Sequence, residues 1–216
     1  MCNLYKMRHP ADEVAGLFRV APVTANVPAE VYPGYPGLVV SGGHLRAMTW
    51  GFPLALAGGS GRPRKPRPVN NARSDKLLGA FWHDSFRHRR CLIPASAWAE
   101  AEGEPGRMTR TWYALPGDRP FALAGLWRDT AEWGAAYSMV MVDAAAQVAE
   151  SHDRMPLVLS PEDWATWLDG DAAAALALCR TYPGRLEIDR SREPWAARRS
   201  GRTPPTAGLG ETPRLL

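Results

Sequence analysis

The chain of 216 residues fits one domain, and its 45% hydrophobic and 22% charged residues are ordinary values for a soluble globular protein. A formal net charge of +4 and a pI near 9.2 weakly indicate a nucleic-acid partner. No segment approaches the roughly 18 apolar residues of a membrane span, and no secretory signal is visible, so a membrane protein is excluded and a cytoplasmic location is expected.

Short strands predominate among the predicted elements, and helices are interspersed without a regular strand–helix alternation. In chain order these elements are a helix over 12–18, a hairpin of strands over 37–40 and 45–50, a Gly-, Pro- and Arg-rich loop over 53–68, a helix over 77–86, strands over 91–93, 111–114, 121–127 and 138–142, and helices over 160–168 and 171–179. The order favours a single α+β domain, residues 1–199, with a mostly antiparallel, barrel-like sheet as its core. Residues 200–216 are predicted to be a disordered tail.

Two other compositional features leave alternatives open. Basic residues are dense at 62–67 and 87–90, where they either contact phosphate or form solvated surface runs. The nine tryptophans are compatible both with a core role and with stacking on unpaired bases.

The cysteines Cys2, Cys91 and Cys179 are odd in number and far apart, and they form no CxxC motif. No Cys/His cluster has the spacing of a zinc site, so neither a metal nor another cofactor is expected. Cys91 and Cys179 are interpreted as core residues with reduced thiols.

Cys2 is the most informative residue of the N-terminus. Initiator methionine is normally removed before a small residue, and the mature chain would then begin with an α-amine and a thiol on adjacent carbons. Their ordinary pKa values, about 8 and about 8.5, leave both partly nucleophilic near neutrality. An amine attacks an aldehyde to form a Schiff base, and a neighbouring thiol can close on it to form a thiazolidine.

Several separated motifs support this chemistry. They are the Met-Cys start, Trp50-Gly51-Phe52, 71–75 (NARSD), 89–95 (RRCLIPA) with 98–100 (WAE), 124–127 (AGLW) and 151–159 (SHDRMPLVL). From Cys2 to about Leu168, this ordered set resembles the SOS response-associated peptidase (SRAP) family of abasic-site-processing proteins. The resemblance implies DNA damage response, covalent capture of abasic sites, and a peptidase activity that removes Met1.

The resemblance also implies roles for individual residues. Cys2 is the expected nucleophile, Asn71 orients the amine and the sugar, and Glu100 and His152 transfer protons. A carboxylate and an imidazole can serve the proton transfers of Schiff-base formation. Taken alone, Asn71 is also a common turn residue, Glu100 an ordinary surface acid, and His152 a strand-entry residue.

DNA contacts are implied in the same way. Arg73 matches a phosphate-binding arginine, Trp50 falls in a segment along the DNA path, and Arg154 is placed with them. The expected partner is single-stranded DNA with abasic sites, or a junction of single and double strand. The protein is expected to act as a monomer, without metal, and to be nucleoid-associated when bound to DNA.

The N-terminal segment departs from the family pattern. Asn3 and Leu4 stand where the family often has glycine and arginine, which removes an expected phosphate contact. Alanines flank Glu100 where aromatic residues are common. We hypothesise that the basic segment 62–67 replaces the lost contact, and replacing Arg62, Arg64, Lys65 and Arg67 with Ser should then weaken DNA binding and flatten its salt dependence.

Two other functions fit parts of the pattern. An N-terminal-nucleophile amidohydrolase would use the thiol of Cys2 on a small-molecule amide, with the amine as base. A non-covalent reader of single-stranded DNA would use tryptophans to stack bases and would leave Cys2 without a role.

Overall fold

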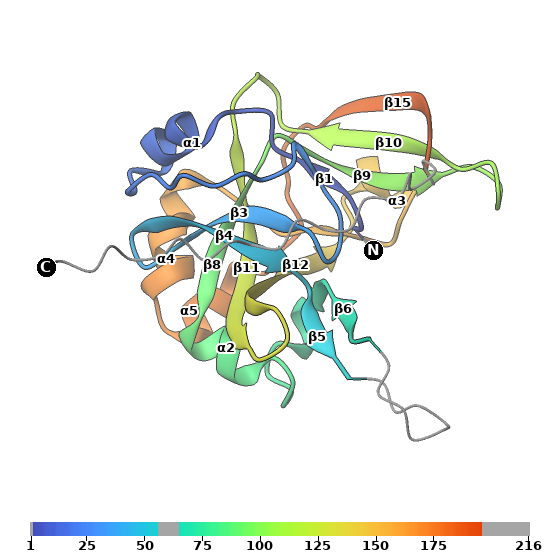
Figure 1. Cartoon of the computed structure of the whole chain (residues 1–216). Helices are drawn as coiled ribbons and strands as arrows, with labels where there is room; N and C mark the ends of the chain where they lie inside the picture. The colour runs from blue at the N-terminus through green and yellow to red at the C-terminus, as the bar shows by residue number, and fades with distance from the viewer. Residues whose placement is uncertain (1, 56–64, 196–216) are drawn as a thin grey trace, which may run out of the picture.

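A five-stranded barrel forms the centre of the computed structural model, which describes residues 2–55 and 65–195 (Figure 1). In order around the ring, its strands are β12 (Gly134–Asp143), β4 (His44–Trp50), β3 (Pro36–Ser41), β8 (Arg90–Ala95) and β11 (Phe121–Thr130). The ring closes because β11 also pairs with β12. The β12–β4 pair is parallel and the other neighbours are antiparallel. The predicted α+β class with a mostly antiparallel, barrel-like core is therefore confirmed.

The main hydrophobic core is shared between the barrel and the elements packed around it. Every residue of β3 and β8 is buried. Burying one large apolar side chain contributes about 1.5–3 kcal/mol. The interior is tightly filled at Gly125 of β11, where a Cβ atom would lie 2.8 Å from the Sγ atom of Cys91. Cys91 is therefore a packed core residue, as expected.

A second, antiparallel sheet lies above the barrel in Figure 1 and carries the N-terminal strand. Its strand order is β15 (Glu187–Pro194), β10 (Thr109–Ala114), β9 (Ala97–Glu102), β1 (Tyr5–Lys6) and β2 (Glu30–Val31). Only Ser96 separates β8 of the barrel from β9 of this sheet. The chain thus passes directly between the two sheets, and β1 lies at their junction.

Short strands extend the barrel beside β12 and β11. There β12 pairs with β7 (Asn71–Arg73) in parallel and with β13 (Arg154–Pro156) antiparallel, while β14 (Val158–Leu159) pairs with β11. A separate hairpin consists of β5 (Phe52–Leu54) and β6 (Arg67–Val69). β12 therefore brings two segments together that are far apart in the sequence.

The helices of the described residues are short and lie around the barrel (Figure 1). They are α1 (Ala11–Phe18), α2 (His83–His88), α3 (Ala146–Ala149), α4 (Trp164–Asp169) and α5 (Ala172–Ala177), with 3-10 turns η1 (Ser74–Lys76) and η2 (Pro161–Asp163). Asp171 caps α5 by accepting a hydrogen bond from the Ala174 amide at 2.7 Å. No helix in this part of the chain is long and apolar enough to cross a bilayer.

Arg90, the last residue of the basic segment 87–90, has a structural role. Its side chain is buried and donates to the main-chain oxygens of Phe86, at 2.7 Å, and of Trp167 and Gly170. Because the guanidinium satisfies carbonyl groups at the ends of α2 and α4, it joins these helices to the barrel.

Most predicted strands and helices occur within a few residues of their predicted bounds, but the helix predicted over 77–86 is wrong in its first half. The amide of Gly79 bonds to the Lys76 carbonyl at 2.9 Å, and the amide of Trp82 bonds to Gly79 at 3.0 Å. These are turns. Phe81 and Trp82 pack on Phe52, with ring centroids 6.3 and 5.4 Å away, and this packing overrides helical propensity.

The loop predicted over 53–68 is partly wrong, because its ends form the β5–β6 hairpin. Residues 56–64, with Arg62 and Arg64, lie outside the described residues, as does the predicted tail over 200–216. Lys65 and Arg67 are exposed. The sequence also failed to predict several strands, among them β9, β7 and β15.

Candidate active site around Cys2

Cys2 is completely buried and is separated from β1 by Asn3 and Leu4. Its Sγ atom lies 3.4 Å from the carbonyl oxygen of Leu4. The amide of Ala99 in β9 donates to that same carbonyl at 2.9 Å, which extends the pairing of β1 and β9 toward Cys2. Burial raises the pKa of the Cys2 thiol well above its ordinary value, and the charge of Glu100 raises it further. The sulfur is therefore held as a neutral thiol within electrostatic reach of Glu100.

Two adjacent asparagines bind the main chain of Cys2. The Nδ2 atom of Asn71 donates to the carbonyl oxygen of Cys2 at 2.8 Å, and Nδ2 of Asn70 donates to the same oxygen at 2.9 Å. Asn71 is buried in β7, where it pairs with Met139 of the central strand β12. The barrel thus positions the asparagines, and the asparagines position Cys2.

Glu100 is a buried carboxyl group on β9, with 2% of its surface exposed. Burial raises its pKa to about 7, and the negative charge of Asp153 acts in the same direction. A carboxyl group with this pKa is present in both protonation states at neutral pH. It can therefore both donate and accept a proton, as acid–base catalysis requires.

His152 lies in the loop between α3 and β13, and its Nδ1 atom accepts a hydrogen bond from the Arg154 amide at 2.9 Å. Burial lowers the pKa of His152, which favours the neutral ring with its proton on Nε2. The same Nδ1 lies 2.9 Å from Oδ1 of Asp153, a pairing that requires a proton on Nδ1. Asp153 is largely exposed, so solvent screens its charge. The hydrogen bond from the Arg154 amide therefore determines that Nδ1 is unprotonated and that the ring is neutral.

The loop that carries His152 is tied to the second sheet. The hydroxyls of Tyr113 in β10 and Ser151 are 2.6 Å apart, and Tyr113 stacks on Trp98 of β9 with ring centroids 5.6 Å apart. The charge of Asp153 in the loop raises the pKa of Glu100, and the charge of Glu100 raises the pKa of Tyr113. The structure therefore brings Cys2, Asn71, Glu100 and the loop of His152 into one region.

Arg73 and Arg154 lie at the ends of β7 and β13 and meet at one carboxylate. Arg73 donates through Nε and Nη2 to Asp75, both at 2.9 Å, and Nη1 of Arg154 lies 4.0 Å from Asp75 and 3.1 Å from Asp143. Both arginines lie on strands that pair with β12. In this structure their guanidinium groups bind carboxylates.

Trp50 is not on the surface, contrary to what a base-stacking role requires. It is completely buried, and its Nε1 atom donates to the main-chain oxygen of Asn70 at 3.0 Å. Its ring packs edge-on against Tyr5, with centroids 5.1 Å apart. Trp50 therefore supports the main chain of Asn70, one of the two asparagines that bind Cys2.

Sequence reasoning missed Asn70. It immediately precedes the recognised N-A-R motif and forms with it the Asn-Asn pair of 70–73 (NNAR), which was the available signal. It also missed Tyr113 and Ser151, which carry no motif of their own and become visible only through the pairing of β9 with β10.

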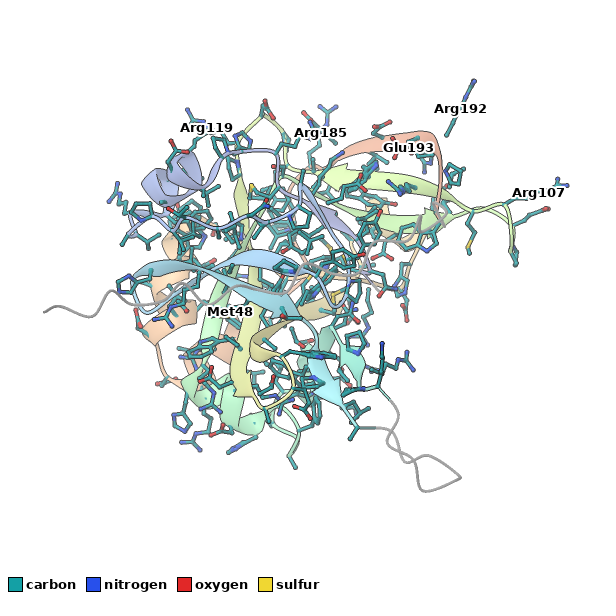
Figure 2. The ribbon with its side chains drawn as sticks, in the orientation of Figure 1. Met48, Arg107, Arg119, Arg185, Arg192 and Glu193 are labelled. Carbon is teal, nitrogen blue, oxygen red and sulfur yellow. The ribbon has the colours of Figure 1, made fainter. Side chains whose placement is uncertain are left out.

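The site shows no metal-binding donor set. No group of three or more His, Cys, Asp or Glu side chains with metal-site geometry occurs among the described residues. Figure 2 shows Arg107, Arg119, Arg185 and Arg192 on the periphery of the fold, pointing outward.

Residues 1–192 match the model of the family described as SOS response associated peptidase (SRAP). No curated protein matches the chain. A crystal structure of a Bordetella bronchiseptica protein has a TM-score of 0.74 with 22% identity, covering 88% of this chain and 99% of that chain. A Bacteroides thetaiotaomicron protein has a TM-score of 0.71 with 16% identity, covering 87% and 90%. A phage-related Bordetella bronchiseptica protein has a TM-score of 0.65 with 21% identity, covering 89% and 95%. At these identities the similarity establishes the fold.

Proposed function

The chain belongs to the SRAP family, and from the arrangement around Cys2 we propose that it captures abasic sites in single-stranded DNA by a covalent link to Cys2. The observation that carries the proposal is Glu100, a buried carboxyl group with a pKa of about 7 that acts electrostatically on the Cys2 thiol. A buried carboxyl group that is present in both protonation states at neutral pH is suited to proton transfer.

The first step is removal of Met1 by hydrolysis of the Met1–Cys2 peptide bond, which gives Cys2 a free α-amine. The family description as a peptidase supports this step. The neutral amine then attacks the aldehyde carbon of the ring-opened sugar. A new C–N bond forms as the C=O π bond breaks, a proton passes from the nitrogen to the former aldehyde oxygen, and a carbinolamine results.

Loss of water from the carbinolamine gives the Schiff base. The acid form of Glu100 donates the proton with which the hydroxyl group departs, and its ionised form then stabilises the iminium cation. Because burial keeps Cys2 as a thiol, a base must take its proton as the sulfur attacks the imine carbon. Ionised Glu100, which the preceding step leaves without its proton, serves as that base. The net reaction joins aldehyde, amine and thiol into a thiazolidine and releases one water molecule.

DNA would approach along the ends of β7 and β13, where Arg73 and Arg154 lie. Phosphate oxygens would replace Asp75 and Asp143 as partners of the two guanidinium groups, since both ligands accept the same bidentate hydrogen bonds. Both arginines would then bind phosphate from strands that pair with β12. The same strand β12 carries Met139, which pairs with Asn71.

The decisive experiment incubates the purified protein with an oligonucleotide that carries one abasic site and separates the products on a denaturing gel. A shifted band that survives boiling and disappears in Cys2→Ala is expected. No shifted band from a chain shown by mass spectrometry to begin at Cys2 would overturn the proposal. An amide-hydrolysis assay and a binding assay with undamaged strand would then distinguish an amidohydrolase from a non-covalent reader.

A further inference from the structure

The carbonyl oxygen of Cys2 accepts two side-chain hydrogen bonds, and the second donor is Asn70. A primary amide has two N–H bonds, and Nδ2 of Asn70 has a separate acceptor for each. One is the carbonyl oxygen of Cys2 at 2.9 Å, and the other is Oδ1 of Asn3 at 3.1 Å. Asn71 supplies the other hydrogen bond to Cys2 at 2.8 Å. The Cys2 carbonyl is therefore bound on both of its lone pairs.

The main chain of Asn70 is itself fixed. Its carbonyl oxygen accepts from the Met139 amide at 2.9 Å and from Nε1 of Trp50 at 3.0 Å. Met139 belongs to the central strand of the barrel and Trp50 is fully buried. The half-buried side chain of Asn70 thus projects from a rigid base toward Cys2.

Two consequences follow for the reacting groups of Cys2. First, the fixed carbonyl holds Cα of Cys2 in place, and the contact of Sγ with the Leu4 carbonyl at 3.4 Å limits rotation about the Cα–C bond, so both nucleophiles hold one orientation. Second, two hydrogen bonds to the carbonyl withdraw electron density from the adjacent amine. The amine binds a proton less tightly, and more of it is neutral at neutral pH.

We propose that Asn70 is a positioning residue for Cys2, and that Asn3 orients it. The inference rests on the proposed function and deepens it. It gives a role to Asn3, which departs from the usual family pattern at this position. Asn70 acts through Cys2 and is not itself a catalytic residue.

Single-turnover capture of an abasic oligonucleotide tests the inference with Asn70→Ala and with the nearly isosteric Asn70→Asp. Removal of one of two orienting hydrogen bonds should slow capture about tenfold in Asn70→Ala. Asn70→Asp should be slower still, because a carboxylate repels the Cys2 carbonyl. In both, the pH midpoint of the rate should rise, since the amine becomes more basic. A role in packing alone would leave that midpoint unchanged.

Gln147→Ala is the matched control. Gln147 also donates a side-chain amide to a main-chain carbonyl, that of Gly184 at 3.0 Å, and its oxygen accepts from the Leu186 amide at 2.9 Å. Its removal costs two comparable hydrogen bonds, both to the segment 184–186 and not to Cys2, so both capture rate and pH midpoint should stay at wild-type values.

Asn3→Ala gives a second test that does not depend on the folding of Asn70 variants, because Asn3 is exposed. It should slow capture by less than Asn70→Ala and raise the midpoint in the same direction. Asn3→Ala in the Asn70→Ala background should add nothing further, as expected for two residues that act through one contact.

Glyceraldehyde, with thiazolidine formation followed by mass spectrometry, separates this inference from the proposed function. If wild-type protein captures no abasic oligonucleotide, the proposed function fails, and the glyceraldehyde rates still report on Asn70. If wild-type protein reacts and both Asn70 variants match its rate and midpoint in both assays, the role of Asn70 is refuted.

Discussion

The hydroxyl groups of Tyr5 and Tyr137 form a fully buried hydrogen bond that joins β1, the strand after Cys2, to β12 of the barrel. A Cβ atom at Gly37 would clash with both hydroxyls, so the pair excludes any larger residue there. Tyr5→Phe should destabilise the fold by about 1–3 kcal/mol, because it leaves the Tyr137 hydroxyl buried without its partner. Urea denaturation of Tyr5→Phe, Tyr137→Phe and the double variant measures this. The double variant should lose less than the sum of the two single variants, and simple additivity would contradict the pairing.

Glu100 should make stability depend on pH. Its folded-state pKa of about 7 exceeds its ordinary value of 4.5, so the folded state binds the proton more tightly than the unfolded chain does. The associated stability is fully present below pH 4.5 and is lost as pH rises through about 7, in total about 3 kcal/mol. Glu100→Gln should remove this loss and flatten the stability profile between these values. Urea denaturation of both proteins at pH 5 and pH 8 tests it, and parallel profiles would contradict the raised pKa.

The barrel was predictable from the sequence because its hairpin and strand signals are strong, as for β3 and β4, which surround a Ser-Gly-Gly turn. β9 was not predicted because residues 97–100 are all buried, so the strand lacks the alternation that marks a half-exposed one. The same burial gives Glu100 its chemistry.

The role of Asn70 depends on contacts that cross the sequence by 67 and 68 residues, to Asn3 and Cys2. No local pattern records such contacts. Similarly, Trp50 looked like a DNA-contacting residue because motif position does not reveal which way a side chain points. The contact between Asn71 and Cys2, in contrast, joins two residues that the N-A-R motif and the Met-Cys start had already singled out as candidates.

Asp75 should compete with DNA phosphate for Arg73. Because the carboxylate occupies both Nε and Nη2 of Arg73, Asp75→Asn should raise affinity for single-stranded DNA several-fold and steepen the salt dependence by about one phosphate contact. Fluorescence anisotropy across a salt series measures both quantities. Asp118→Asn, which makes the same charge change in an exposed loop, is the control. Equal gains in the two variants would show an effect of net charge alone.

Trp50→Phe separates a structural role of the indole from a base-stacking role. The variant keeps a buried aromatic ring but loses the Nε1 hydrogen bond to Asn70. It should lower stability by about 1–3 kcal/mol, because the Asn70 carbonyl loses one of its partners, and it should slow covalent capture. Affinity for an undamaged single strand should stay unchanged, since the ring has no exposed surface on which a base could stack. Denaturation, gel capture and anisotropy measure these three quantities. A selective loss of affinity at wild-type stability would instead place Trp50 in direct contact with DNA.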